Sequence, residues 1–207
     1  MIETPTRDKA ANDHISSIAA DLLGDLGGDV TIHSEKEFGD HITADWPTSG
    51  SYASRQHALI VGHLDTVWPF GTLERMGYTE KEGRLYGPGV LDMKSGIATT
   101  IIGLRTLKEN NLWPNRPIKI LFNTDEEVGS PSSRPLVEKS AKGAEYALIM
   151  EPGQAGAGAL KTTRKGLGEF RIYVEGKASH AGAFPERGAS AIHELSQKVV
   201  ELQAMND

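Results

Sequence analysis

The sequence has no cysteine, and its other shortages narrow the range of functions as well. Without a thiol among 207 residues, disulfides and thiolate zinc sites are excluded, so any metal ligands have to be His, Asp or Glu. Basic residues are also few, since 22 Lys and Arg stand against 28 Asp and Glu, a formal net charge of -6. Nucleic acid is therefore a disfavoured partner, because phosphate binding needs a basic stripe that is not visible here.

Long hydrophobic runs are lacking too. No stretch approaches the ~18 apolar residues that a membrane span requires, and residues 1–8 contain no apolar core of signal-peptide length. We therefore expect a cytoplasmic protein with no membrane contact. The remaining composition is that of a globular protein, and its 23 glycines favour an enzyme with many tight loops over a helical bundle.

Hydrophobic periodicity predicts helices that alternate with strands. Helical spacing of apolar residues marks 15–26, 95–108, 135–141 and a last helix from 192 to the chain end. Short apolar runs predict strands at 57–61, 118–122 and 146–150, the first of them buried on both faces. This alternation predicts an α/β fold, with helices packed on a largely parallel sheet.

The character of the chain changes after Glu151. A Gly/Ala stretch covers 153–158, and residues 167–174 then alternate between apolar and polar, which is typical of a half-exposed antiparallel strand. One strand and one helix bury their own apolar faces poorly. We therefore predict one domain over residues 1–161 and the truncated beginning of a second over 162–207.

Three predicted strands end in groups that could bind a metal. His63 and Asp65 follow the first strand, Glu126 and Glu127 the second, and Glu151 the third. In open α/β sheets, ligands collect at the carboxyl ends of the strands. Several carboxylates gathered there repel one another unless a positive charge lies between them, so the combination indicates a metal site.

Each group also has a simpler interpretation when it is taken alone. These alternatives are a hydrogen-bonded pair at a strand end for His63 and Asp65, a helix cap for Asp92, a solvated acidic loop for Glu126 and Glu127, and an exposed loop histidine for His180. Short motifs have high false-positive rates one by one. The metal interpretation therefore depends on their combination.

In their order along the chain, the motifs resemble the aminoacylase and glutamate carboxypeptidase family of co-catalytic zinc peptidases. The motifs are Gly62-His63-Leu64-Asp65-Thr66, Tyr86-Gly87-Pro88-Gly89, Asn123-Thr124-Asp125-Glu126-Glu127, Met150-Glu151-Pro152 and Ala178-Ser179-His180-Ala181-Gly182. The resemblance covers nearly the whole chain from about His57. It implies a three-layer α/β/α catalytic domain in residues 1–161, and the start of a smaller α+β lid or dimerisation domain in 162–207.

The resemblance also implies a role for each motif residue. His63, Asp92 and Glu151 would bind one zinc ion; Asp92 would bridge to a second zinc also held by Glu127; Asp65 would orient His63; Glu126 would be the general base and acid; and His180 would polarise the substrate carbonyl. A non-proline cis peptide bond is implied between Asp92 and Met93. His and carboxylate ligands also admit Co²⁺ or Mn²⁺.

The activity implied is hydrolysis of an amide bond through a di-zinc-activated water, releasing a C-terminal amino acid from a small peptide or N-acyl amide. Residues 122–130 and 177–186 look closest to the glutamate carboxypeptidase branch, which favours glutamate as that amino acid. An N-acyl-amino-acid deacylase shares every motif and stays an alternative. The resemblance further implies a homodimer formed through the lid domain.

One element of the family pattern has no counterpart in this sequence. The family completes its second zinc site with a histidine far downstream, beyond the position of Asp207. We therefore expect this chain to be the N-terminal part of a longer enzyme. An inactive metal-binding fragment is the alternative from a different functional class.

Overall fold

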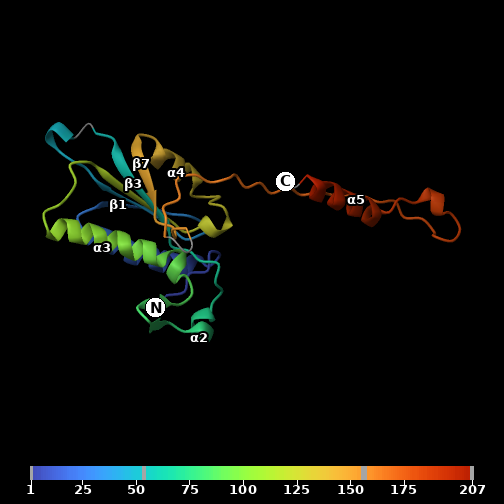
Figure 1. Cartoon of the computed structure of the whole chain (residues 1–207), viewed down its shortest axis with the longest axis horizontal. Helices are drawn as coiled ribbons and strands as arrows, with labels where there is room; N and C mark the ends of the chain where they lie inside the picture. The colour runs from blue at the N-terminus through green and yellow to red at the C-terminus, as the bar shows by residue number, and fades with distance from the viewer. Residues whose placement is uncertain (1, 53–54, 155–157, 206–207) are drawn as a thin grey trace. The chain divides into compact units, whose positions relative to one another are not determined.

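The computed structural model describes residues 2–52, 55–154 and 158–205 (Figure 1). The chain divides into two compact units, Met1–Lys161 and Thr162–Asp207. A division into compact units does not show what each unit does. The assignment of 1–161 as a catalytic domain and of 162–207 as a truncated lid domain therefore stays a prediction. None of the helices in the described part of the chain is both long and apolar enough to cross a membrane.

A five-stranded sheet forms the centre of the first unit, in the strand order β1-β2-β6-β3-β7. Its strands are β1 (Asp29–His33), β2 (His41–Trp46), β3 (His57–His63), β6 (Ile118–Asn123) and β7 (Ala144–Ile149). β3 runs parallel to β6 and β7, whereas β2 is antiparallel to β6 and β1 is antiparallel to β2. The predicted α/β class is confirmed; β6, β3 and β7 are its parallel part.

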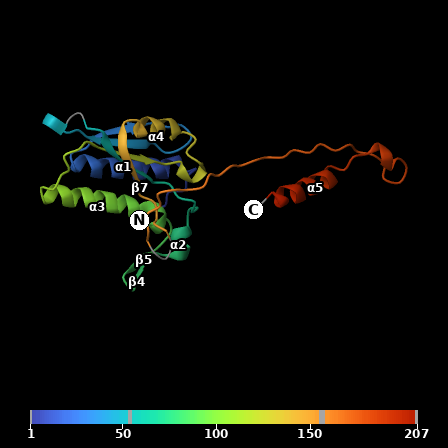
Figure 2. The ribbon, with the colours of Figure 1, turned by 45° about the horizontal axis from the view of Figure 1, so that its top comes forward.

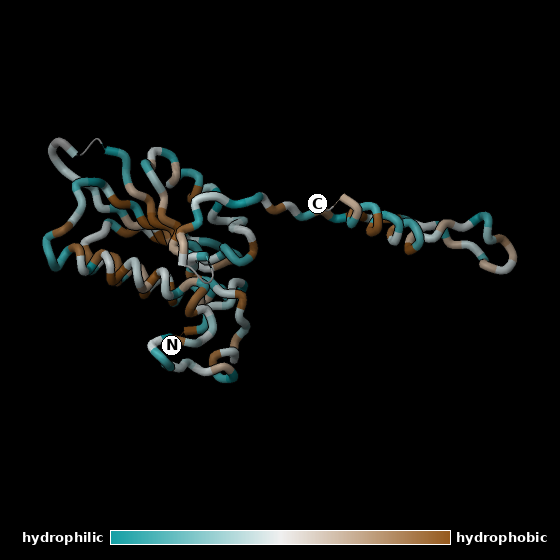
Figure 3. Tube along the Cα trace, in the orientation of Figure 1, coloured by the Kyte–Doolittle hydropathy of each residue, from teal (hydrophilic) through white to brown (hydrophobic). Residues whose placement is uncertain are grey.

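Apolar sequence explains why β3 and β6 lie at the centre. Leu59 on β3 and Ile120 and Phe122 on β6 are fully buried, as expected of parallel strands covered on both faces. Figure 3 shows the hydrophobic residues of this unit gathered in the strands of the sheet. The outer strand β7 differs, because Tyr146 and Leu148 on it are exposed.

Helices cover both faces of this sheet. They are α1 (Lys9–Asp25), α3 (Ser95–Glu109) and α4 (Arg134–Ala141). Figures 1 and 2 show α1 and α3 on one face and α4 on the other. Leu23 of α1 and Ile101 of α3 share one hydrophobic core with Ile120 of β6. Asp8 caps the start of α1, since its Oδ1 accepts from the Ala11 amide at 2.8 Å.

Short elements connect these layers. They are the 3₁₀ turn η1 (Gly50–Tyr52), helix α2 (Thr72–Met76), the hairpin β4 (Thr79–Lys81) and β5 (Arg84–Tyr86), the irregular turn η2 (Val90–Lys94) and the 3₁₀ turn η3 (Glu126–Val128). The parallel register pairs His63 of β3 with Asn123 of β6. Both strands therefore end at the same level, and the polar segments that follow them meet at one edge of the sheet.

The second unit contains the 3₁₀ turn η4 (Pro185–Arg187) and helix α5 (Ala191–Ala204). The last helix was predicted from its periodicity and is confirmed. The predicted strand over 167–174 is wrong, because the described backbone there forms no strand. Alternation of apolar and polar residues needs a partner strand to become a sheet, and Leu167 and Phe170 are instead fully or almost fully exposed.

Candidate metal centre

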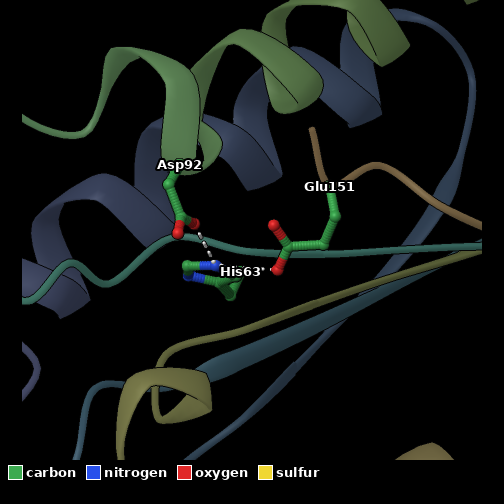
Figure 4. A group of neighbouring side chains, drawn as sticks. All are labelled: His63, Asp92 and Glu151. Carbon is green, nitrogen blue, oxygen red and sulfur yellow. Dashed lines mark hydrogen bonds and ion pairs between the residues drawn. The ribbon is translucent and has the colours of Figure 1, made fainter. Parts of the chain in front are cut away.

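His63 is the last residue of β3, and its ring is the centre of the candidate site. The residue is only 1% exposed. Its Nε2 lies 3.0 Å from Asp92 Oδ1 and 3.3 Å from Glu151 Oε1. Figure 4 shows both carboxylates pointing toward the ring from different segments. The sequence prediction that these three residues act together therefore agrees with where their side chains lie, although their role as ligands stays a prediction.

The three side chains come from places where regular structure ends. His63 closes β3, Asp92 lies in the irregular turn before α3, and Glu151 comes two residues after β7. The peptide bond between Asp92 and Met93 is cis, as the family resemblance implied. One potential ligand atom from each of the three residues lies within 4.8 Å of the other two. In residues 2–52, 55–154 and 158–205, this is the one such group of three.

Asp65 lies on the other side of the His63 ring. The Nδ1–H of His63 donates to the backbone oxygen of Asp65 at 3.0 Å, and Nδ1 lies 3.3 Å from the carboxylate Oδ1. Asp65 is fully buried, and its two carboxylate oxygens accept from the amides of Glu126 and Glu127, each at 3.3 Å. These contacts fix the tautomer of a neutral His63, with Nε2 directed at the other carboxylates.

Glu126 and Glu127 lie in a turn just beyond the second predicted strand. β6 ends at Asn123, and both residues lie in the 3₁₀ turn η3. Glu126 Oε2 is 3.9 Å from His63 Nε2. Glu127 is not part of the group of three, but it is close enough to Asp92 for the charge of that residue to raise the pKa of Glu127. The Asp65 carboxylate accepts from the amides of both residues and so holds the turn next to His63.

Electrostatics show a strong excess of negative charge at this edge of the sheet. Burial alone would lower the pKa of His63, but bonds to Asp65 and Glu151 and the charge of Glu126 raise it to about 11. Burial raises the pKa of Glu126, and the neighbouring carboxylates raise it further. Burial and then the charge of Asp92 raise the pKa of Glu127. A cation at this place would relieve the repulsion.

The donor set fits a divalent metal ion. One imidazole nitrogen and two carboxylate oxygens are ligands of the kind that zinc binds in catalytic sites, where a fourth position stays available to water or substrate. The ring of His63 is held from behind by Asp65, which is the usual arrangement for a metal-ligating histidine. The residues present therefore fit one ion fully, and Asp92 with Glu127 would supply part of a second site.

His180 belongs to the second unit and is exposed there. Its Nδ1 accepts from the amides of Gly182 at 3.2 Å and Ala183 at 3.0 Å. A nitrogen that accepts two hydrogen bonds carries no proton. The neutral ring therefore bears its hydrogen on Nε2, which is the form that can donate to a carbonyl oxygen.

Asp125 turned out to have a structural environment that the motif alone did not indicate. It is fully buried, and its carboxylate accepts from the amides and hydroxyls of Ser132 and Ser133 at 2.6–3.0 Å. Although burial opposes ionisation, these bonds hold the pKa of Asp125 below its ordinary value. The first acid of the Asp-Glu-Glu motif thus has its hydrogen-bond partners in the loop before α4.

A histidine and carboxylates gathered at the carboxyl ends of parallel strands are typical of metal-dependent hydrolases of the α/β class. Family comparison is more specific. The family described as peptidase family M20/M25/M40 matches residues 59–204. The chain belongs to this family, whose members are metal-dependent, and the resemblance expected from the motifs is confirmed.

Individual relatives include both carboxypeptidases and deacylases. The chain is 39% identical over 152 residues to carboxypeptidase G2 of Pseudomonas sp. (strain RS-16), covering 73% of this chain and 37% of the relative. It is 33% identical over 155 residues to acetylornithine deacetylase of Proteus mirabilis (strain HI4320), covering 72% and 38%. The chain thus spans less than two fifths of the length of these relatives.

A solved structure supports the fold. A tripeptidase from Staphylococcus aureus is similar with a TM-score of 0.69 and 19% sequence identity, covering 96% of this chain and 52% of that one. At this identity the likeness concerns the fold alone.

Proposed function

We propose that the protein is a zinc-dependent hydrolase that cleaves the amide bond before a C-terminal amino acid of a small peptide or N-acyl amide. The observation that carries this proposal is the group formed by His63, Asp92 and Glu151, with Glu126 next to it. The higher identity to carboxypeptidase G2 than to the acetylornithine deacetylase favours peptidase over deacylase activity. Glutamate as the released amino acid is the finer part of the proposal.

In this proposal His63, Asp92 and Glu151 would hold one zinc ion, and Asp92 and Glu127 would be ligands of a second. The contribution of zinc when bound is Lewis acidity, which polarises a carbonyl and makes water more acidic. Asp65 keeps Nε2 of His63 directed at the ion. The role of His180, as the group that would polarise the substrate carbonyl, stays a prediction from the family resemblance.

Glu126 moves the proton. Its carboxylate is exposed to solvent and lies 3.9 Å from His63 Nε2. Burial and the surrounding carboxylates raise its pKa, and a general base is most effective when its pKa is closer to the working pH. Glu126 accepts the proton of the attacking water and returns it to the leaving amine. Such proton transfer contributes ~100- to 10,000-fold to rate.

The test combines metal content with turnover. We would measure zinc per chain by elemental analysis for the wild type and for Asp92→Ala, and follow hydrolysis of a glutamate-terminated amide and of an N-acetyl amino acid. Glu126→Gln should keep its zinc and lose at least ~100-fold in rate. Glu109→Gln, an exposed change at the end of α3, serves as its matched control and should behave as wild type.

The outcomes separate the candidate functions. Preference for the glutamate-terminated amide supports the carboxypeptidase, and preference for the N-acetyl amino acid supports the deacylase. Zinc that is bound without hydrolysis of either substrate favours a metal-binding role for this chain. A wild type that binds no zinc would contradict the whole proposal. Homodimer formation and cytoplasmic location stay predictions from the sequence.

A further inference from the structure

The segment of residues 3–6 lies against the loop that follows His63, although no motif marks it in the sequence. The Thr66 amide donates to Thr4 O at 2.8 Å, and the Thr6 amide donates to Thr66 O at 3.2 Å. Thr4 is fully buried and Thr6 is 6% exposed. The hydroxyl of Thr4 also donates to Leu64 O at 2.7 Å. Main-chain and side-chain bonds therefore hold the segment in one position.

The hydroxyl of Thr6 reaches the carboxylate that supports the His63 ring. Thr6 Oγ1 donates to Asp65 Oδ2 at 2.8 Å, whereas its other available acceptor, Thr66 O, is at 3.3 Å. Hydrogen bonds to a carboxylate are shorter and stronger than those between neutral groups, so the carboxylate is the main partner. The other contacts of the Asp65 carboxylate, with Nδ1 of His63 and the amides of Glu126 and Glu127, are all 3.3 Å long.

The geometry of Asp65 explains why its hydrogen bond with Thr6 affects the imidazole ring of His63. The carboxylate of Asp65 turns about a single side-chain bond, so a partner that holds Oδ2 also fixes where Oδ1 lies. Oδ1 is the oxygen that faces His63 Nδ1. Thr6 itself has little freedom to turn, because its β-branched side chain is stiff and its amide is bonded to Thr66.

We propose that Thr6 is a positioning residue of the metal centre, which orients the His63 imidazole for metal binding through the Asp65 carboxylate. This inference rests on the proposed function, because it concerns the same site. It adds to the site a residue from the beginning of the chain, 57 positions before His63. Thr6 touches neither the metal ligands nor the substrate in this role.

The test uses three variants of the 207-residue chain. Thr6→Val removes the hydroxyl and keeps the shape, and Thr6→Ser restores the hydroxyl. Thr43→Val is the matched control, because Thr43 is a buried threonine on β2 whose hydroxyl bonds to His33 Nε2 at 2.8 Å. For each variant we would measure the zinc dissociation constant by competition with a chromophoric chelator.

A second measurement needs no metal. In the metal-free chain, NMR of the ¹⁵N-labelled imidazoles reports solvent exchange of the Nδ1–H of His63, with the signal assigned by its loss in His63→Gln. Thr6→Val should weaken zinc binding at least ~10-fold, as is common for groups that support a ligand, and should speed this exchange. Thr6→Ser and Thr43→Val should match the wild type in both measurements.

Two results would overturn the role of Thr6. One is a Thr6→Val chain with wild-type zinc affinity and an unchanged imidazole signal. The other is a Thr6→Ser chain as impaired as Thr6→Val, because shape rather than the hydroxyl would then matter. A wild-type chain that binds no zinc would refute the proposed function separately, and the imidazole exchange in the metal-free chain would still decide whether Thr6 orients the ring.

Discussion

Gly96, the second residue of α3, offers a sharp test of how the sheet positions Glu151. A Cβ added at Gly96 would lie 2.0 Å from the backbone oxygen of Met150. Real Cβ atoms almost never come within 3.0 Å of another heavy atom, so Gly96→Ala has to move α3 and Met150 apart by at least 1.0 Å. Glu151 follows directly on Met150 and would be displaced with it. Metal sites tolerate distance changes of only about 0.2 Å.

The expected effect of Gly96→Ala is a loss in both stability and metal binding. Overpacking against rigid backbone costs about 1–3 kcal/mol in free energy of unfolding. For a chain of this size that lowers the midpoint of thermal unfolding by roughly 2–12 °C. Displacement of the Glu151 carboxylate should weaken zinc binding at least ~10-fold, by analogy with the loss of groups that orient ligands.

The assay is thermal unfolding of the metal-free chain together with zinc titration, and Gly103→Ala is the matched control. Gly103 lies on the same helix, is exposed, and has no atom within 4 Å of an added Cβ. Alanine there should stabilise the chain by up to ~1 kcal/mol, through helix propensity, and leave zinc binding unchanged. If Gly96→Ala gained stability as Gly103→Ala does and bound zinc normally, the close contact between α3 and Met150 would not position Glu151.

Three further changes have defined outcomes. Zinc at 100 times its dissociation constant should add about 2.7 kcal/mol to the free energy of unfolding, seen in calorimetry as a rise in the unfolding midpoint that a chelator reverses; an unchanged midpoint would argue against a bound ion. Asp125→Ala should cost about 1–3 kcal/mol, because it leaves the buried donors of Ser132 and Ser133 without their acceptor. The pKa of Asp125 is lowered in the folded state, so the stability that its carboxylate contributes is present above about pH 4. That stability is lost as the pH falls through the folded-state pKa. Urea unfolding should therefore show a smaller difference in stability between wild type and Asp125→Ala in acid. Asp8→Ala should cost about 1 kcal/mol in urea unfolding through loss of the cap on α1, whereas Asp8→Asn should be nearly neutral; equal losses in both would show that the cap is not the cause.

Strand ends were the most predictable part of the site. The apolar runs before His63, Glu126 and Glu151 indicated parallel strands, and parallel strands bring their carboxyl ends to one edge. His63 Nε2 and Glu151 Oε1 accordingly lie 3.3 Å apart although the two residues are 88 positions apart in the sequence. Local pattern was sufficient for β3 and β6 because burial of both faces gives such strands a distinctive composition.

Other parts depend on contacts that no local pattern encodes. Thr6 has no periodic or motif signal, and its partner Asp65 is 59 residues away. The alternation at 167–174 is typical of a strand, yet in the described part of the chain no strand pairs with these residues. β7 was expected as a strand from its apolar run, but no local pattern indicated that it would be an outer strand of the sheet.

The contacts of Asp65 have a consequence for how the protein folds. Its carboxylate joins Thr6, Glu126 and Glu127, which lie 59, 61 and 62 positions away along the chain. Contacts at such separation form slowly, because the intervening loops have to be closed first. The helices can form early from local interactions, but the Asp65 contacts require β3 and β6 to be paired. We therefore expect the proposed metal site to be completed late in folding rather than at the initial collapse.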